Sequence, residues 1–88
     1  MASKTVLVGS AVGLHARPAA LIAQAAGQCD DEILLSLQGS DEDSVDAASS
    51  LMIMTLGAAK GAAVTVESEN AEAVEQIAAL IERDLDAE

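Results

Sequence analysis

One histidine, one proline and an arginine lie within four residues of one another in this chain. His15, Arg17 and Pro18 belong to the segment GLHARPA at positions 13–19, and no other histidine or proline occurs. An imidazole has an ordinary pKa of about 6.5, so it is largely neutral and nucleophilic at pH 7. A guanidinium two residues away can donate paired hydrogen bonds to a phosphate. These residue types at this spacing favour transfer of a phosphoryl group to the histidine.

The N-terminus of a helix would be a favourable place for a phosphoryl group on this histidine. Pro18 opens an alanine-rich segment that runs to about Ala26, and Gly27 is well placed to end a helix. We therefore predict a first helix that starts beside His15. The first backbone N–H groups of a helix lack partners within it, and its N-terminus carries partial positive charge, so both features favour a bound phosphoryl group.

A histidine can also bind a metal ion or belong to a catalytic triad. The segment around His15 holds no Cys, Asp or Glu, so local sequence offers neither a metal cluster nor a catalytic triad. The acidic runs at 30–32 and 41–43 lack the glycine and closing glutamate of a calcium loop, and we predict that they are solvated turns. On physical grounds alone, one alternative stays open, in which His15 merely hydrogen-bonds a loop and Arg17 is solvated.

The elements that must position this segment are predicted from hydrophobic periodicity. Residues 4–8, 32–38 and 62–68 alternate apolar and polar side chains, as half-buried strands do. Residues 43–46 are a candidate edge strand, and residues 49–56 a candidate short helix that Gly57 ends. Asn70 is placed to cap a last helix, whose apolar residues follow the i, i+3, i+4, i+7, i+11 pattern. These residues are Val74, Ile77, Ala78, Ile81 and Leu85. The order predicts an α+β fold, with helices packed on one face of an antiparallel sheet.

Length, composition and charge limit the classes of protein that remain. The 88 residues suit a single domain, 1–88, and without Phe, Tyr or Trp its core must be aliphatic.

Cys29 is the only cysteine, which rules out an internal disulfide and fits a reducing compartment. We expect no signal peptide and no membrane insertion, since the longest apolar run is far shorter than the ~20 residues of a span. Fifteen acids against four bases give a net charge of −11, which repels nucleic acid. A cytoplasmic location is expected.

The segment GLHARPA closely resembles the active-site motif of HPr, the family of histidine-containing phosphocarriers of the bacterial phosphoenolpyruvate-dependent sugar phosphotransferase system. The likeness covers nearly the whole chain, including the segment SSLMIMTLG at 49–57 and the turn AKGA at 59–62. The resemblance implies an open-faced sandwich, in which three helices cover one face of a four-stranded antiparallel sheet in the order βαββαβα. It implies no cofactor.

The resemblance also implies a relay between proteins. Enzyme I, phosphorylated by phosphoenolpyruvate, would pass a phosphoryl group to His15, which would hand it to the IIA unit of a sugar permease. His15 would accept the group through the ring nitrogen nearer the main chain. Arg17 and the backbone N–H groups of Ala16 and Arg17 would stabilise the phosphate. The chain would then be a stoichiometric carrier rather than an enzyme, acting as a monomer.

Members of this family dock their partners through an apolar patch on the first and second helices. The matching positions here are Ala20, Gln24, Ser50, Leu51, Met54 and Thr55. Ser50 departs from the usual apolar residue and should weaken the patch. For Leu51 and Met54 the alternative is ordinary core packing at helical spacing.

Ser49 matches a serine that a dedicated kinase phosphorylates in many relatives from low-GC Gram-positive bacteria. In those relatives a lysine commonly precedes the serine and an apolar residue follows it, whereas here the neighbours are Ala48 and Ser50. Serine also caps helices well without modification. We expect Ser49 to be the cap of the short helix and a poor substrate of such a kinase, although regulatory phosphorylation stays an alternative.

Two other classes of protein compete with a phosphocarrier. The tripeptide Asp43-Ser44-Val45 faintly resembles the Asp-Ser-Leu site of acyl carrier proteins, in which the serine bears phosphopantetheine. Acyl carriers are all-helical, and the three strand patterns contradict that fold. The second rival is a regulatory module that keeps the fold but acts by binding alone, and the presence of both His15 and Arg17 argues against it.

Overall fold

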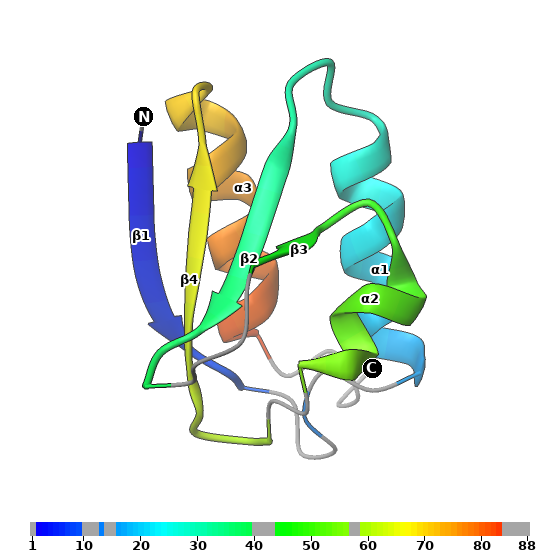
Figure 1. Ribbon diagram of the computed structural model, residues 1–88, viewed down its shortest axis with the longest axis vertical. Helices are drawn as coiled ribbons and strands as arrows, with labels where there is room; N and C mark the ends of the chain where they lie inside the picture. The colour runs from blue at the N-terminus through cyan, green and yellow to red at the C-terminus, as the bar shows by residue number, and fades with distance from the viewer. Residues whose placement is uncertain (1, 10–12, 14–15, 40–43, 57–58, 84–88) are drawn as a thin grey trace.

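The computed structural model of this chain describes residues 2–9, 13, 16–39, 44–56 and 59–83. Its elements, shown in Figure 1, follow the order strand, helix, strand, strand, helix, strand, helix. They are β1 (Ala2–Leu7), α1 (Ala16–Gly27), β2 (Ile33–Leu37), β3 (Val45–Asp46), α2 (Ser50–Thr55), β4 (Ala63–Ser68) and α3 (Ala71–Glu82). The predicted order βαββαβα is confirmed.

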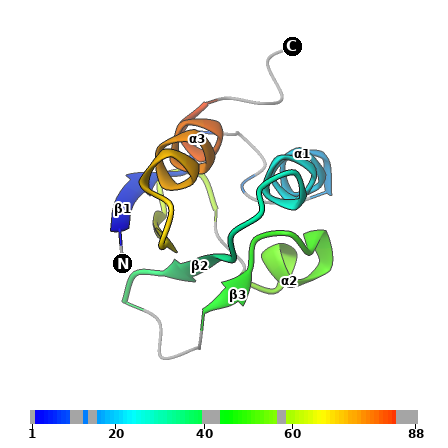
Figure 2. The ribbon, with the colours of Figure 1, turned by 90° about the horizontal axis from the view of Figure 1, so that it is seen from above.

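The four strands form one antiparallel sheet in the order β1-β4-β2-β3. Val66 of the central strand β4 lies between Lys4 of β1 and Leu35 of β2. Helix α3 packs against β1 and β4, and α1 packs against both α2 and α3. Figure 2 shows the helices gathered on one side of the sheet, with α1 between α3 and α2. The α+β sandwich with one open face is confirmed, and this sheet excludes the all-helical acyl carrier fold.

The core lies between the sheet and the helices and is built from aliphatic side chains. The predicted alternation is confirmed, because Val6, Val64 and Val66 are buried whereas Thr5 is exposed and Thr65 is only partly buried. The largest aliphatic side chains that are fully buried come from both layers. They are Ile22, Leu35, Ile53, Val64, Val66, Val74, Ile77 and Ile81.

Helix α1 starts beside His15 in the sequence and ends at Gly27, as predicted. It begins at Ala16, two residues before Pro18, which is tolerated because the N–H groups of a first turn have no partner within the helix. Gly27 is its last helical residue and does not take a positive φ. The helix ends instead by tightening, as the N–H groups of Gln28 and Cys29 donate to the carbonyls of Ala25 and Ala26.

The two later helices begin at the caps that the sequence predicts. Asn70 Oδ1 accepts from the N–H groups of Glu72 and Ala73, at 3.0 and 3.3 Å. Ser49 Oγ accepts more weakly from the N–H of Met52, at 3.4 Å.

Leu85, predicted to continue the apolar face of α3, lies outside the described residues. No helix in the described ranges has the length and apolarity needed to cross a membrane.

Candidate functional site

The chain that leaves β1 toward the histidine segment is held from two sides. The N–H of Val8 donates to the carbonyl of Ala62 at 2.9 Å, and the N–H of Gly61 returns a bond to the carbonyl of Val8 at 2.9 Å. One residue later, the N–H of Gly9 donates to the carbonyl of Ile81 at 3.0 Å. The turn before β4 and the end of α3 therefore fix where the loop toward His15 begins.

Glycine is required at position 9 by a close approach of two backbones. A Cβ built on Gly9 would lie 1.9 Å from the carbonyl oxygen of Glu82, far inside van der Waals contact. Gly13, later in the same loop, takes a φ of 73°, which few residues other than glycine adopt. The sequence singled out these glycines only as loop residues, because the contact of Gly9 with α3 joins distant parts of the chain.

The predicted phosphoryl acceptor, His15, lies outside the described residues, as does Leu14. The described segment resumes with Ala16 and Arg17 as the first two residues of α1. Arg17 is exposed, whereas Pro18 and Ala19 are buried and hold the first turn of the helix against the core. The guanidinium of this turn is thus exposed, two residues after the histidine in the sequence.

The residues predicted for docking lie on α1 and α2, which pack together. Leu51 is 72% exposed, so the alternative in which it packs in the core is wrong. Met54 is partly buried against the core, while Ile53 supplies the buried side of α2. The other predicted docking residues divide by exposure. Ala20, Gln24 and Thr55 are exposed and Ser50 is partly buried.

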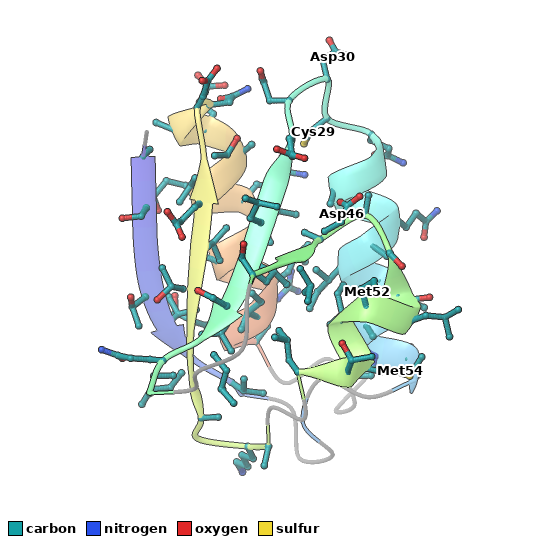
Figure 3. All side chains as sticks on the ribbon, viewed as in Figure 1. Cys29, Asp30, Asp46, Met52 and Met54 are labelled. Atoms are coloured by element: carbon teal, nitrogen blue, oxygen red, sulfur yellow. The ribbon has the colours of Figure 1, made fainter. Side chains whose placement is uncertain are left out.

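Met52 is an exposed apolar residue that does not belong to the docking positions predicted from the sequence. It is 44% exposed, and Figure 3 shows it with Met54 on α2. In the sequence the two methionines flank Ile53, which is buried. A helix of six residues is too short for a periodicity that separates its inner face from its outer one. Once Ile53 is known to face the core, helical geometry places its immediate neighbours away from it.

Charge is distributed unequally among the three helices. Arg17 is the only charged residue in the sequence of α1, and α2 has none. All fifteen acids of the chain lie outside these two helices, and α3 carries Glu72, Glu75 and Glu82. The surface formed by α1 and α2 is therefore uncharged apart from one guanidinium, within a molecule of net charge −11.

The opposite end of α1 carries the acidic turn that precedes β2. Asp30, Asp31 and Glu32 are exposed, and Asp31 accepts a hydrogen bond from Asn70 Nδ2 at 3.0 Å. The Cys29 thiol is partly buried and donates to the carbonyl of Ala25 at 3.6 Å; Figure 3 labels it beside Asp30. Among the described residues, no three His, Cys, Asp or Glu side chains are grouped to hold a metal ion. The acidic run 41–43 lies outside those residues.

The fold places this chain in a class of small proteins, the open-faced sandwiches in which helices cover one face of a four-stranded antiparallel sheet. The family described as the PTS HPr component phosphorylation site matches residues 2–83. The chain belongs to this family, the HPr phosphocarriers of the phosphotransferase system.

Solved structures of the same family resemble this chain over most of its length. The phosphocarrier protein HPr of Bacillus anthracis is 35% identical with a TM-score of 0.81, over 91% of this chain and 95% of that one. HPr-C-His of Thermoanaerobacter tengcongensis is also 35% identical with a TM-score of 0.81, over 93% and 92% of the two chains. Crh, a catabolite repression protein of Bacillus subtilis, is 33% identical with a TM-score of 0.68 over 92% and 93%, and its structure is a swapped, intertwined dimer.

Proposed function

We propose that this protein accepts a phosphoryl group on His15 from phosphorylated enzyme I and passes it to IIA units of sugar permeases, as a cytoplasmic monomer. The observation that carries the proposal is the exposed guanidinium of Arg17 in the first turn of α1, two residues after His15 in the sequence. The guanidinium and the N–H groups of Ala16 and Arg17 form a site for a doubly charged phosphoryl group. Membership of the HPr family supports the same chemistry.

In the proposed transfer, a ring nitrogen of His15 attacks the phosphorus atom held by enzyme I. The new N–P bond forms as the bond from phosphorus to its carrier on enzyme I breaks, and the second transfer reverses these roles at the IIA unit. The protein contributes position and charge rather than further covalent chemistry. Arg17 offsets the charge of the bound group, while the exposed apolar residues of α1 and α2 hold the partner.

The test is incubation with phosphoenolpyruvate and enzyme I. The wild-type protein should take up one phosphoryl group through a bond that is labile in acid and stable in alkali, because a phosphoramidate loses its group once the nitrogen is protonated. His15→Ala should take up none. Phosphorylation of the His15→Ala protein by enzyme I would show that the acceptor lies elsewhere.

Arg17 is tested by two substitutions at fixed ionic strength. Arg17→Lys should slow transfer by about tenfold, although it keeps the charge, because an ammonium cannot make the paired hydrogen bonds of the guanidinium. Arg17→Glu should slow it further. Equal transfer rates for the wild-type protein and both variants would show that Arg17 is solvated and does not stabilise the phosphoryl group.

A second candidate function, regulation by binding alone, is favoured by the likeness to Crh. The same incubation separates the two functions, because a purely regulatory module would not take up phosphate from enzyme I. Sedimentation equilibrium tests the proposed monomer independently.

A further inference from the structure

A groove of about 540 Å³ separates α1 from α3, on the side of α1 away from α2. Leu21 lines it from α1, Gln28 from the turn that ends α1, and Gln76 and Leu80 from α3. Leu21 is 36% exposed there, and Leu80 is partly buried against the core. The lining combines aliphatic side chains with the carboxamides of three glutamines, and it lies outside the predicted docking patch except at Gln24, which belongs to both.

The groove follows one stripe of residues on each helix. On α1 the stripe runs from Arg17 through Leu21 and continues to Gln28 in the turn after the helix, at spacings of four and seven residues. On α3 the equivalent stripe runs from Glu72 through Gln76. From Arg17 to Gln28 the stripe spans about 16 Å, which is about three turns of a helix.

The two helices run in opposite directions, as Figure 1 shows, so the ends of the groove differ in charge. Arg17 and Arg83 lie at the end next to the proposed phosphorylation site. Glu72 lies at the other end, where Asp31 is tied to Asn70 by a hydrogen bond of 3.0 Å. The lining itself contains no carboxylate, although the chain carries fifteen acids. Arg17 therefore places a positive charge at the site end of the groove, and Glu72 places a negative charge at the far end.

We infer that this groove is an extension of the docking surface that takes an amphipathic helix of the phosphoryl-transfer partner. The apolar residues of the partner helix, spaced three and four residues apart, contact Leu21 and Leu80. The polar edges of that helix form hydrogen bonds with the glutamines that line the groove. An acidic residue of the partner lies beside Arg17, and a basic residue lies beside Glu72. This inference rests on the proposed function, because it places the partner helix so that one end reaches the residues next to His15.

The apolar contact is tested with Leu21→Gln and Leu80→Gln, and with Leu7→Gln as a control on the open face of the sheet, where Leu7 is 61% exposed. Each protein serves as substrate of enzyme I and as phosphoryl donor to a IIA unit. The groove variants should raise KM by about tenfold for at least one partner with kcat little changed, the signature of lost binding rather than lost chemistry. Leu7→Gln should match the wild-type protein. Leu80→Gln can also lower the melting temperature, so Leu21→Gln, at the more exposed residue, decides the outcome.

The charge contact is tested with Glu72→Lys against Glu69→Lys, which changes the net charge equally at an exposed residue outside the groove. Glu72→Lys should raise KM by about threefold and Glu69→Lys should not. Values of KM within twofold of wild type for both groove tests and both partners would overturn the inference and leave the proposed function intact. A dimer in sedimentation equilibrium that Leu21→Gln dissociates would also overturn it, because the occupant would then be a second copy.

Failure of the proposed function gives a different result. If the wild-type protein takes up no phosphate from enzyme I, calorimetric titration with the unphosphorylated enzyme and the IIA unit still decides the inference. Weaker binding by Leu21→Gln than by Leu7→Gln would support the groove as a partner site. Absence of binding by the wild-type protein, or equal binding by both variants, would overturn it.

Discussion

Helices α2 and α3 begin in the same way but have different roles. Each follows a residue in extended conformation whose side chain accepts from the N–H groups of the first turn, Ser49 for α2 and Asn70 for α3. α3 has twelve residues and buries an aliphatic stripe against β1 and β4, whereas α2 has six residues and buries Ile53. α3 holds the fold together, and α2 presents Leu51 and Met52 to the solvent.

The distribution of charge follows the same division. The exposed positions of α3 include three glutamates, which keep its outer side soluble. α2 leaves uncharged, apolar side chains exposed, although each costs some free energy of hydration. A protein that must meet a donor and an acceptor in turn gains from an adaptable surface of Met and Leu. The difference between these helices therefore distinguishes residues kept for stability from residues kept for contact.

The largest expected effect comes from the buried isoleucines. Ile77→Ala in α3 should lower the free energy of unfolding by about 2–5 kcal/mol, because it leaves a cavity at a fully buried site. The remaining folded protein should transfer phosphate with an unchanged KM. Ile53→Ala in α2 should lower stability and also raise KM, because Ile53 holds the exposed residues in place. Urea denaturation and transfer kinetics measure the two effects, and a raised KM in Ile77→Ala would break the division.

Leu51→Asp should show the opposite pattern. Its side chain is largely exposed, so the free energy of unfolding should change by less than about 0.5 kcal/mol. KM for enzyme I should rise by about tenfold, equivalent to about 1.4 kcal/mol of lost binding. Met54→Asp should raise KM and also lower stability, since Met54 packs partly against the core.

Leu7→Asp is the matched control for Leu51→Asp. Leu7 is also a largely exposed leucine, but it lies on the open face of the sheet. It should leave KM unchanged. Unaltered kinetics in both the Leu51 and Met54 variants would place the docking surface elsewhere.

The two caps should differ by a smaller amount. Asn70→Ala should cost about 1 kcal/mol of stability, because two N–H groups lose their acceptor. Ser49→Ala should cost about 0.5 kcal/mol, because its single bond is long. Thermal unfolding of both variants checks the order, and equal or reversed costs would show that the strength of the cap does not follow its geometry.

Ser49 should also stay unmodified when a kinase from a relative is supplied. Its role as a cap is satisfied by the bond to Met52, and its neighbours Ala48 and Ser50 lack the lysine and the apolar residue that flank the matching serine in relatives. Mass spectrometry after incubation with the purified kinase and ATP should detect little phosphoserine. Rapid, stoichiometric phosphorylation at this residue would instead make α2 a regulated surface.

The sequence predicted the sheet, the last helix and the caps because these features depend on local periodicity and on side chains that bond within three residues. Asn70 could be placed as a cap for this reason. The start of α1 beside His15 could be predicted from Pro18, which the first turn of a helix tolerates. The contact of Gly9 with Glu82 and the exposure of Met52 could not be predicted, because both depend on how distant elements pack.

The smallest expected effect concerns the ion pair between the sheet edge and α3. Lys4 Nζ lies 2.8 Å from Glu75 Oε2, and this hydrogen bond, together with the charge of Glu75, raises the pKa of Lys4 above its ordinary value. A raised pKa in the folded state stabilises the protein below the ordinary pKa of lysine, and the contribution is lost as the pH rises through the higher, folded-state pKa. Both side chains are well exposed, so the effect is screened by salt and should be smaller than that of either cap.

A double-mutant cycle of Lys4→Met and Glu75→Gln, measured by urea denaturation, should give a small favourable coupling at pH 8 and low salt. The coupling should vanish in 1 M NaCl and above the raised pKa. A coupling of equal size under all three conditions would show that Lys4 and Glu75 interact through packing of their side chains rather than through charge.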